Sequence, residues 1–336
     1  MCRKHLYFFL ALFVISATLA FGQKAELNQK GTSMANFLKI GIGARATAMG
    51  GAYVALSNDV SSLYWNPGGL GMLGKNEALF QITNWIMDTK LYFVGISYKL
   101  SSLGILGFHF NSFSSGDIEE TTILEPEGTG RSFTASDFSV GLTFSRQLTN
   151  RFSAGITLKY ISESLDRENA KTVAIDIGSI FITNFFNNLR IGFAFCNLGG
   201  RMQLAGTDLN FQHLAEPGIK YTRAELGTEP WDIPLMFRFG IATDVIRSDV
   251  ITFTMSTEVM DSRDFTYRIA TGGELALKDI MFLRGGYKFN YDEADLTFGV
   301  GLKLSIPSGI GLKLDYAYGN YGILNNTQIL SAIFMF

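Results

Sequence analysis

The sequence predicts an all-β membrane protein: a fourteen-stranded antiparallel outer-membrane β-barrel with a small helical hatch, or plug, at its N-terminus. Three observations predict this fold. Segments of roughly ten residues alternate apolar with small or polar side chains from residue 77 onwards, the connections between them alternate in length, and the chain ends in Phe336. Strands of this length cross a membrane at a tilt, and an even strand number is typical of bacterial outer-membrane barrels.

The first expected element is a secretory signal peptide over residues 1–22. Arg3 and Lys4 precede the apolar run LYFFLALFVISATLA, and the small residues of AFG follow it as at a cleavage site. A membrane anchor is the alternative, but the run is shorter than the ~18–20 residues of a spanning helix. The whole chain has 28 basic and 30 acidic residues, a balance that excludes a strongly basic nucleic-acid binder.

Residues 23–76 are expected to form the hatch, folded into the periplasmic mouth of the barrel. The run ARATAMGGAYVAL is dense in Ala and Gly, which suits short helices in a confined space. Asn58 or Asp59 is a candidate helix cap, and Pro67 is expected to end that helix.

Two glycine patterns in this segment resemble nucleotide sites. Gly41–Ala46 fits a loose G-x-G-x-x-G/A, and Gly69–Lys75 fits most of a phosphate-binding loop. The first pattern lacks the βαβ context of a dinucleotide fold, and the second is followed by Asn76 where a Ser or Thr would bind Mg²⁺. We therefore expect no nucleotide and no other cofactor.

Residues 77–336 are expected to form the transmembrane barrel. In LTFGVGLKLSI, for example, one face carries Leu, Phe, Val, Leu, Leu and Ile while the other carries Thr, Gly, Gly, Lys and Ser, a period of two that indicates a strand. The expected strands are 77–84, 90–100, 103–113, 133–147, 151–163, 171–183, 189–198, 233–245, 250–260, 265–277, 280–290, 294–306, 309–319 and 326–336.

The connections between these strands alternate between short and long. Short turns such as 101–102 and 246–249 alternate with connections such as 114–132 and 199–232, as expected for a periplasmic and an outer end. Acidic residues gather in the long set. At the C-terminus, Phe336 with Phe334 and Leu330 resembles the terminal signature of barrels inserted by the outer-membrane assembly machinery, although the end of any hydrophobic strand could look similar.

The glycine-rich segment resembles the N-terminal signature of the PorV/PorQ family of outer-membrane proteins and, more distantly, the FadL fatty-acid channel family. The residues that carry the resemblance are Gly43, Ala44, Arg45, Ala46, Met49, Gly50, Gly51, Ala52, Asp59, Trp65, Asn66, Pro67, Gly69 and Leu70. Such proteins usually have Ala where this chain has Gly68, a small change. Both families have fourteen strands, which agrees with the independent count.

The resemblance implies a function in type IX secretion: binding the C-terminal signal domain of exported cargo and handing it to surface attachment machinery. The alternative is a FadL-like channel for the uptake of hydrophobic small molecules or fatty acids, and a structural envelope role is a third reading. The implied partners are outer-membrane lipid, secreted cargo proteins and other secretion-system components, with a hydrophobic or anionic small molecule as a further ligand class. The implied location is the bacterial outer membrane.

Candidate binding residues fall into two groups. The long connection 199–232 offers Phe211, Leu214, Tyr221 and Trp231 as anchors of a partner-binding loop. The inward strand positions are rich in bases, among which Arg238, Arg268 and Arg284 are candidate lumen ligands for an anion. Two histidines outside the signal peptide are too few for a usual zinc site, and no catalytic constellation is present, so we expect no enzyme and no metal.

Overall fold

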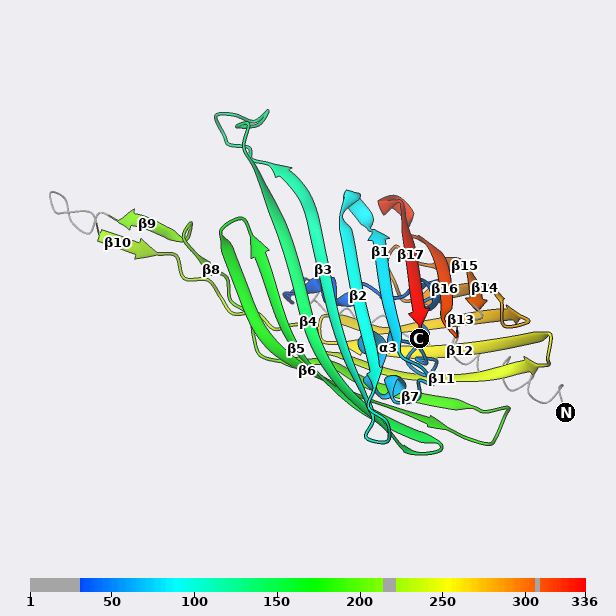
Figure 1. The fold of residues 1–336 in the computed structure, drawn as a ribbon. Helices are drawn as coiled ribbons and strands as arrows, with labels where there is room; N and C mark the ends of the chain where they lie inside the picture. The colour runs from blue at the N-terminus through cyan, green and yellow to red at the C-terminus, as the bar shows by residue number, and fades with distance from the viewer. Residues whose placement is uncertain (1–30, 214–221, 306–308) are drawn as a thin grey trace.

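The computed structural model describes residues 31–213, 222–305 and 309–336. The expected signal peptide therefore lies outside the described residues. Fourteen strands of the described chain form the barrel (Figure 1). They are β1 (Glu77–Asn84), β2 (Lys90–Lys99), β3 (Ile105–Glu119), β4 (Ser132–Thr149), β5 (Phe152–Leu165), β6 (Glu168–Ile182), β7 (Arg190–Gly199), β11 (Met236–Arg247), β12 (Ile251–Ser262), β13 (Phe265–Leu277), β14 (Met281–Phe289), β15 (Leu296–Ser305), β16 (Gly311–Asn320) and β17 (Asn326–Met335).

The sheet closes because the first and last strands pair with each other. Each strand is antiparallel to its neighbours, and β1 pairs with β17 from Glu77↔Met335 to Asn84↔Gln328. Burial alternates along the strands as the sequence pattern predicts: in β15 the side chain of Thr297 is buried, whereas Phe298 and Val300 are exposed toward the membrane. The predicted fold class, a fourteen-stranded antiparallel barrel, is confirmed.

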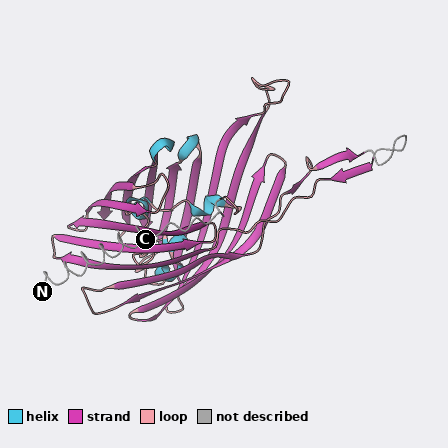
Figure 2. Cartoon of the chain, turned by 180° about the vertical axis from the view of Figure 1, so that it is seen from behind, coloured by secondary structure: helices cyan, strands magenta, loops and turns pink. Residues whose placement is uncertain are grey.

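Two long connections carry strand structure that the sequence pattern did not predict. Strand β3 continues to Glu119 and pairs there with the start of β4 at Ser132, so part of connection 114–132 belongs to a tall hairpin. The connection after β7 holds β8 (Ala205–Gly206), which pairs with β6, and a separate hairpin of β9 (Asn210–His213) and β10 (Thr222–Glu225). Figures 1 and 2 show both hairpins projecting well beyond the barrel.

The plug segment, which we define as residues 31–76, packs inside the barrel. Its short helices are η1 (Asn36–Lys39), α2 (Ala44–Ala48), α3 (Ser62–Trp65) and α4 (Pro67–Leu70); η2 (Ile86–Asp88) and η3 (Gly322–Leu324) lie in outer connections. Helix α2 packs against β14 to β17, and α4 packs against β4 to β6 on another part of the wall. No helix among the described residues is long and apolar enough to cross a membrane.

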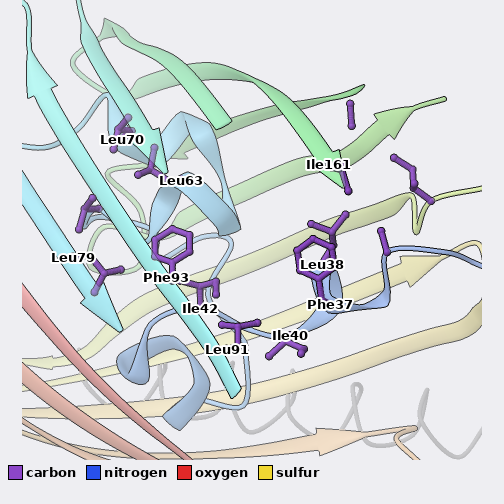
Figure 3. Close-up of a cluster of buried hydrophobic side chains, with 14 of the residues drawn as sticks. Phe37, Leu38, Ile40, Ile42, Leu63, Leu70, Leu79, Leu91, Phe93 and Ile161 are labelled. Carbon is purple, nitrogen blue, oxygen red and sulfur yellow. The ribbon is translucent and has the colours of Figure 1, made fainter. Parts of the chain in front are cut away.

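Apolar side chains of the plug segment share one core with the inner face of the wall. Phe37, Leu38, Ile42, Leu63 and Leu70 are buried against strand residues, as the close-up in Figure 3 shows. Those wall partners include Leu79, Leu91, Phe93 and Ile161. The interior of this barrel is therefore a packed core over part of its circumference, and hydrophobic burial holds the segment in place.

The local helix signals in the plug segment differ from the expectation at Pro67. Asn66 is extended, as a residue before proline must be, and it ends α3. Its side-chain oxygen then accepts the Gly68 N–H at 3.0 Å, so Asn66 caps a second helix that starts at Pro67. Asp59 accepts the Ser61 N–H just ahead of α3 rather than capping it directly. Pro67 thus separates two helices.

Candidate functional site

Arg45 is the centre of a polar network that joins the plug segment to the wall. Its guanidinium Nε donates a hydrogen bond to Glu274 Oε2 and its Nη2 donates one to Glu274 Oε1, each at 2.7 Å. The third nitrogen, Nη1, donates to Asn58 Oδ1 at 2.7 Å and to Tyr53 Oη at 3.0 Å. The Tyr53 hydroxyl in turn donates to Asp59 Oδ2 at 2.6 Å. Two members of the family-like motif, Arg45 and Asp59, thereby belong to one ion-paired cluster with the wall residue Glu274.

Charge keeps Asp59 ionised within this cluster. Burial raises the pKa of a carboxyl group, but Lys313, Arg45 and the hydrogen bonds from Ser61 and Tyr53 outweigh burial and hold the pKa of Asp59 below its usual value. Asp59 therefore serves as a permanent anion that stabilises the fold of the plug segment.

Three wall or turn carboxylates bind the backbone or side chains of the plug segment. Glu258 Oε2 accepts the N–H groups of Tyr53 and Val54 at 2.9 and 2.8 Å, and Glu77 Oε2 accepts the Val60 N–H at 2.8 Å. Asp264, in the turn between β12 and β13, accepts the Ser33 hydroxyl at 2.8 Å and pairs with Lys39. Hydrogen bonds to ionised acceptors are stronger than neutral ones.

The motif Trp65-Asn66-Pro67 contacts both the plug segment and the wall. The indole N–H of Trp65 donates to the Ile42 carbonyl. The Asn66 amide donates to the Val54 carbonyl at 2.9 Å and to the Ser179 carbonyl of β6 at 3.0 Å. These bonds fix the two halves of the segment against each other and against β6.

Glycines on the wall provide the space that the plug segment occupies. A Cβ added at Gly286 would lie 2.2 Å from the Gly50 nitrogen, one at Gly272 would lie 2.3 Å from the Met49 oxygen, and one at Gly192 would lie 2.3 Å from the Val54 oxygen. Gly50 and Gly51 themselves have φ of +72° and +84°, a region that side chains disfavour. Backbone therefore packs directly on backbone.

Gly68 departs from the Ala usual in the resemblance, and the wall explains why glycine is needed here. A Cβ at Gly68 would lie 2.6 Å from Ser179 Cα and 2.7 Å from the Gly178 oxygen, both backbone atoms that cannot move aside cheaply. The substitution, which sequence alone treats as small, is thus matched to a close approach of α4 to β6.

Cavities lie on both sides of the plug segment. A polar cavity of about 720 Å³ opens at the short-turn end and is lined by Arg45, Asp59 and the turn residues 247–250 and 278–279, among others. A smaller cavity of about 70 Å³ lies toward the long connections, and Gly50, Gly51 and Trp65 form its floor. Residues of the plug segment line both cavities.

The candidate lumen bases differ in their pairing. Arg238 Nη1 pairs with Glu258 at 2.9 Å, and Arg284 pairs with Glu274 at 2.6 Å and Asp315 at 2.7 Å. Arg268 instead lies over the rings of Phe265 and Tyr291, at 3.7 and 4.3 Å from their centroids. Arg238 and Arg284 are therefore neutralised by wall acids, and the three arginines do not form one anion site.

The candidate partner-binding residues do not form one described patch. Phe211 lies on β9 and Trp231 pairs through its backbone with Met202, and each side chain is 47% exposed. Leu214 and Tyr221 lie outside the described residues. Ile123 and Leu124, at the tip of the β3–β4 hairpin, are 101% and 92% exposed and were not among the predicted anchors. Their position as two adjacent aliphatic residues within an acidic outer connection is the sequence signal that could have indicated a binding site.

The fold and the plug segment define a fourteen-stranded outer-membrane barrel with an N-terminal segment packed in its lumen. Similar solved structures include the CymD monoaromatic hydrocarbon channel (11% identity, TM-score 0.54), the Ralstonia pickettii toluene transporter TbuX (12%, 0.53) and the P. putida toluene transporter TodX (11%, 0.53). Each match covers 88% of this chain and 97% of the other. At this identity the likeness shows the fold alone.

The chain belongs to the PorV family: the family model described as type IX secretion system protein PorV matches residues 23–263. This confirms the resemblance carried by the plug motif, the outer-membrane location and an association with type IX secretion. The family and the structural neighbours are secretion and transport barrels rather than enzymes. A comparison with curated proteins found no match.

Proposed function

We propose that this barrel binds the C-terminal signal domain of exported cargo at its long-connection end and hands the cargo to the surface attachment machinery. Membership of the PorV family supports a secretion role. The observation that carries the binding surface is the hairpin tip, where Ile123 and Leu124 are fully exposed beside Glu119, Glu120 and Glu125. Acidic neighbours keep this tip in water, and solvent-exposed apolar residues on a projecting element are typical of a protein-binding site.

The neighbouring hairpin of β9 and β10 is a second part of this proposed surface. It carries the exposed Phe211, and Leu226 follows it with 60% of its surface exposed. Aromatic and aliphatic side chains among polar ones make up the usual mixture of a non-obligate interface. Phe211, Leu214, Tyr221 and Trp231 remain the proposed anchors of this loop.

A pull-down with matched variants tests the cargo proposal. The double variant Ile123→Asp/Leu124→Asp should lose at least tenfold in affinity for an isolated cargo signal domain. The control Leu103→Asp, which changes an exposed leucine in a short turn, should bind like wild type. Equal binding by all three proteins would remove the hairpin tip from the interface.

The alternative function is passage of a hydrophobic small molecule. The fold shared with hydrocarbon and toluene transporters favours it, together with cavities on both sides of the plug segment. The charged lining of the larger cavity opposes it, because an apolar solute gains nothing from such surroundings. Uptake of a fluorescent fatty acid by cells with and without the barrel decides this point: uptake that depends on the barrel supports the channel, and equal uptake rejects it.

A further inference from the structure

The small cavity above the plug segment has more positive charge than its acids can neutralise. Its lining contains four bases, Lys39, Arg238, Arg268 and Lys288, and one acid, Glu258. Lys39 is paired with Asp264 and Arg238 with Glu258. Glu258 is fully engaged, because its other oxygen accepts two N–H groups of the plug segment. Arg268 and Lys288 have no carboxylate partner among the described residues.

Hydrogen-bond donors without a protein acceptor also gather around this cavity. Eight buried side-chain polar atoms of the described residues lack a partner, and three of them belong to residues of this lining: Thr47 Oγ1, Arg238 Nε and Arg268 Nε. All three can donate a hydrogen bond. Buried donors normally have acceptors, so a group of unmatched donors beside unpaired cations indicates an acceptor that the protein itself does not supply.

Aromatic rings form part of the remaining walls and contact both bases. Trp85 packs edge to face on Tyr321 at 5.1 Å. Lys288 Nζ lies 5.1 Å from the centroid of Tyr321 and donates to its hydroxyl at 3.3 Å, while Arg268 lies over Tyr291. Cation–π contacts stabilise these charges only in part, so the geometry is preorganised for an anion.

We propose that this cavity binds a small oxyanion group, a carboxylate or a phosphate, between Arg268 and Lys288, with Thr47 as a further donor. A volume of about 70 Å³ accommodates a head group of a few atoms and no more. The oxyanion belongs either to a free ion or to the acidic end of an amphiphile. This site is separate from the proposed cargo surface.

Calorimetric titration of the purified full chain tests the site. The probes are acetate, inorganic phosphate and hexanoate, and chloride keeps the ionic strength constant. Saturable binding of at least one probe is expected, weakened at least tenfold in Arg268→Gln and in Lys288→Gln. The control Lys303→Gln, which alters a rim base paired with Asp279, should bind like wild type. Hexanoate binding more tightly than acetate identifies an amphiphile; equal binding identifies a free ion. No saturable binding, or equal affinity in all variants, would overturn the proposal.

A stability measurement keeps the test valid if a variant folds poorly. Removing a partly buried cation that has no counter-ion should leave the melting temperature without added anion unchanged or higher. Added anion should raise the melting temperature of wild type and Lys303→Gln, but not of Arg268→Gln or Lys288→Gln. A large loss of stability in both variants without anion would show that these bases are structural and would contradict the site.

Discussion

Arg45 in α2 and Glu274 in β13 meet as a two-pronged ion pair across the lumen, and Arg284 of β14 donates to the same carboxylate at 2.6 Å. One wall carboxylate thus holds a plug cation and a wall cation together. The Arg45 and Glu274 side chains are only 13% and 6% exposed, so the pair is poorly screened by solvent. It fixes the position of the plug segment against the strands nearest to it.

Glu274→Gln should loosen the plug segment, because it leaves two guanidinium groups without their shared anion. Breaking a buried pair from one side costs about 3 kcal/mol. Single-channel recording should show more frequent opening, and deletion of residues 24–72 should raise conductance further. Lys303→Gln, which breaks a partly exposed pair with Asp279, is the control and should cost under about 1 kcal/mol. Unchanged conductance after the deletion would mean that another segment closes the barrel.

Gly286→Ala should displace the plug segment, whereas Gly285→Ala should not. The added methyl group at Gly286 would lie 2.2 Å from the Gly50 nitrogen, while at the neighbouring Gly285 its nearest contact would be 3.9 Å away. Overpacking of this kind costs about 1–3 kcal/mol. Urea unfolding of the two variants in detergent provides the comparison, and equal midpoints would show that backbone contact at Gly50 is unimportant. Bulky substitutions at Gly50 or Gly51 should act in the same direction.

Single cysteines should report which end of the barrel faces outward. A cysteine at Ile123, in the long connection 114–132, should react with a membrane-impermeant maleimide on intact cells. A cysteine at Ser102 or Asp249, in the short turns, should react only after the outer membrane is opened. The native Cys196 is buried and should stay silent in both conditions. Equal labelling of both sets in intact cells would refute this orientation.

The contacts that join Asp264 to Ser33 and Lys39 of the plug segment should weaken in acid. Hydrogen bonds from Lys39, Ser33 and Ser262 hold the pKa of Asp264 below its usual value against the opposing effect of burial. A lowered folded-state pKa gives stability that is present above about pH 4 and is lost as the pH falls through the folded value. Hydrogen exchange at residues 33–40 should therefore be slower in wild type than in Asp264→Asn at pH 7, by about tenfold, and the two rates should converge as the pH falls through the lowered pKa of Asp264. A difference that stays constant over this pH range would count against this role of Asp264.

Lys75→Ala should have no measurable effect on stability or ligand binding. Its amine donates to the Gly309 carbonyl at 2.7 Å in an exposed position, and such a bond contributes little. A change in melting temperature of more than about 2 °C would show that this end of the plug segment has a role that the structure does not reveal.

The strands could be predicted from the sequence because a period of two is a property of the chain itself. Phe298 and Val300 face lipid, and Thr297 between them faces the interior, as the alternation requires. The pairing of the lumen arginines could not be predicted, because their partners lie on other strands and depend on register. Arg268 and Arg284 look alike in sequence, yet Arg284 meets two acids and Arg268 meets two aromatic rings. The family motif led to the expectation of a plug, but it could not indicate the wall glycines that contact residues 49–54 and 66–68, because these are scattered over several strands.

The bonds between the ends of this chain also constrain how it assembles. Ala44 N donates to Ser331 Oγ at 3.2 Å, and Asn76 and Phe336 exchange backbone hydrogen bonds at 3.1 and 3.0 Å. These contacts join residues that are far apart in the sequence. The chain must therefore lose the entropy of closing a long loop before these contacts can stabilise it. Barrel closure at β1 and β17 and the final docking of α2 should therefore occur together, as one late step. Such a chain folds slowly, and until that step its apolar core and two unpaired strand edges stay open to other binding partners.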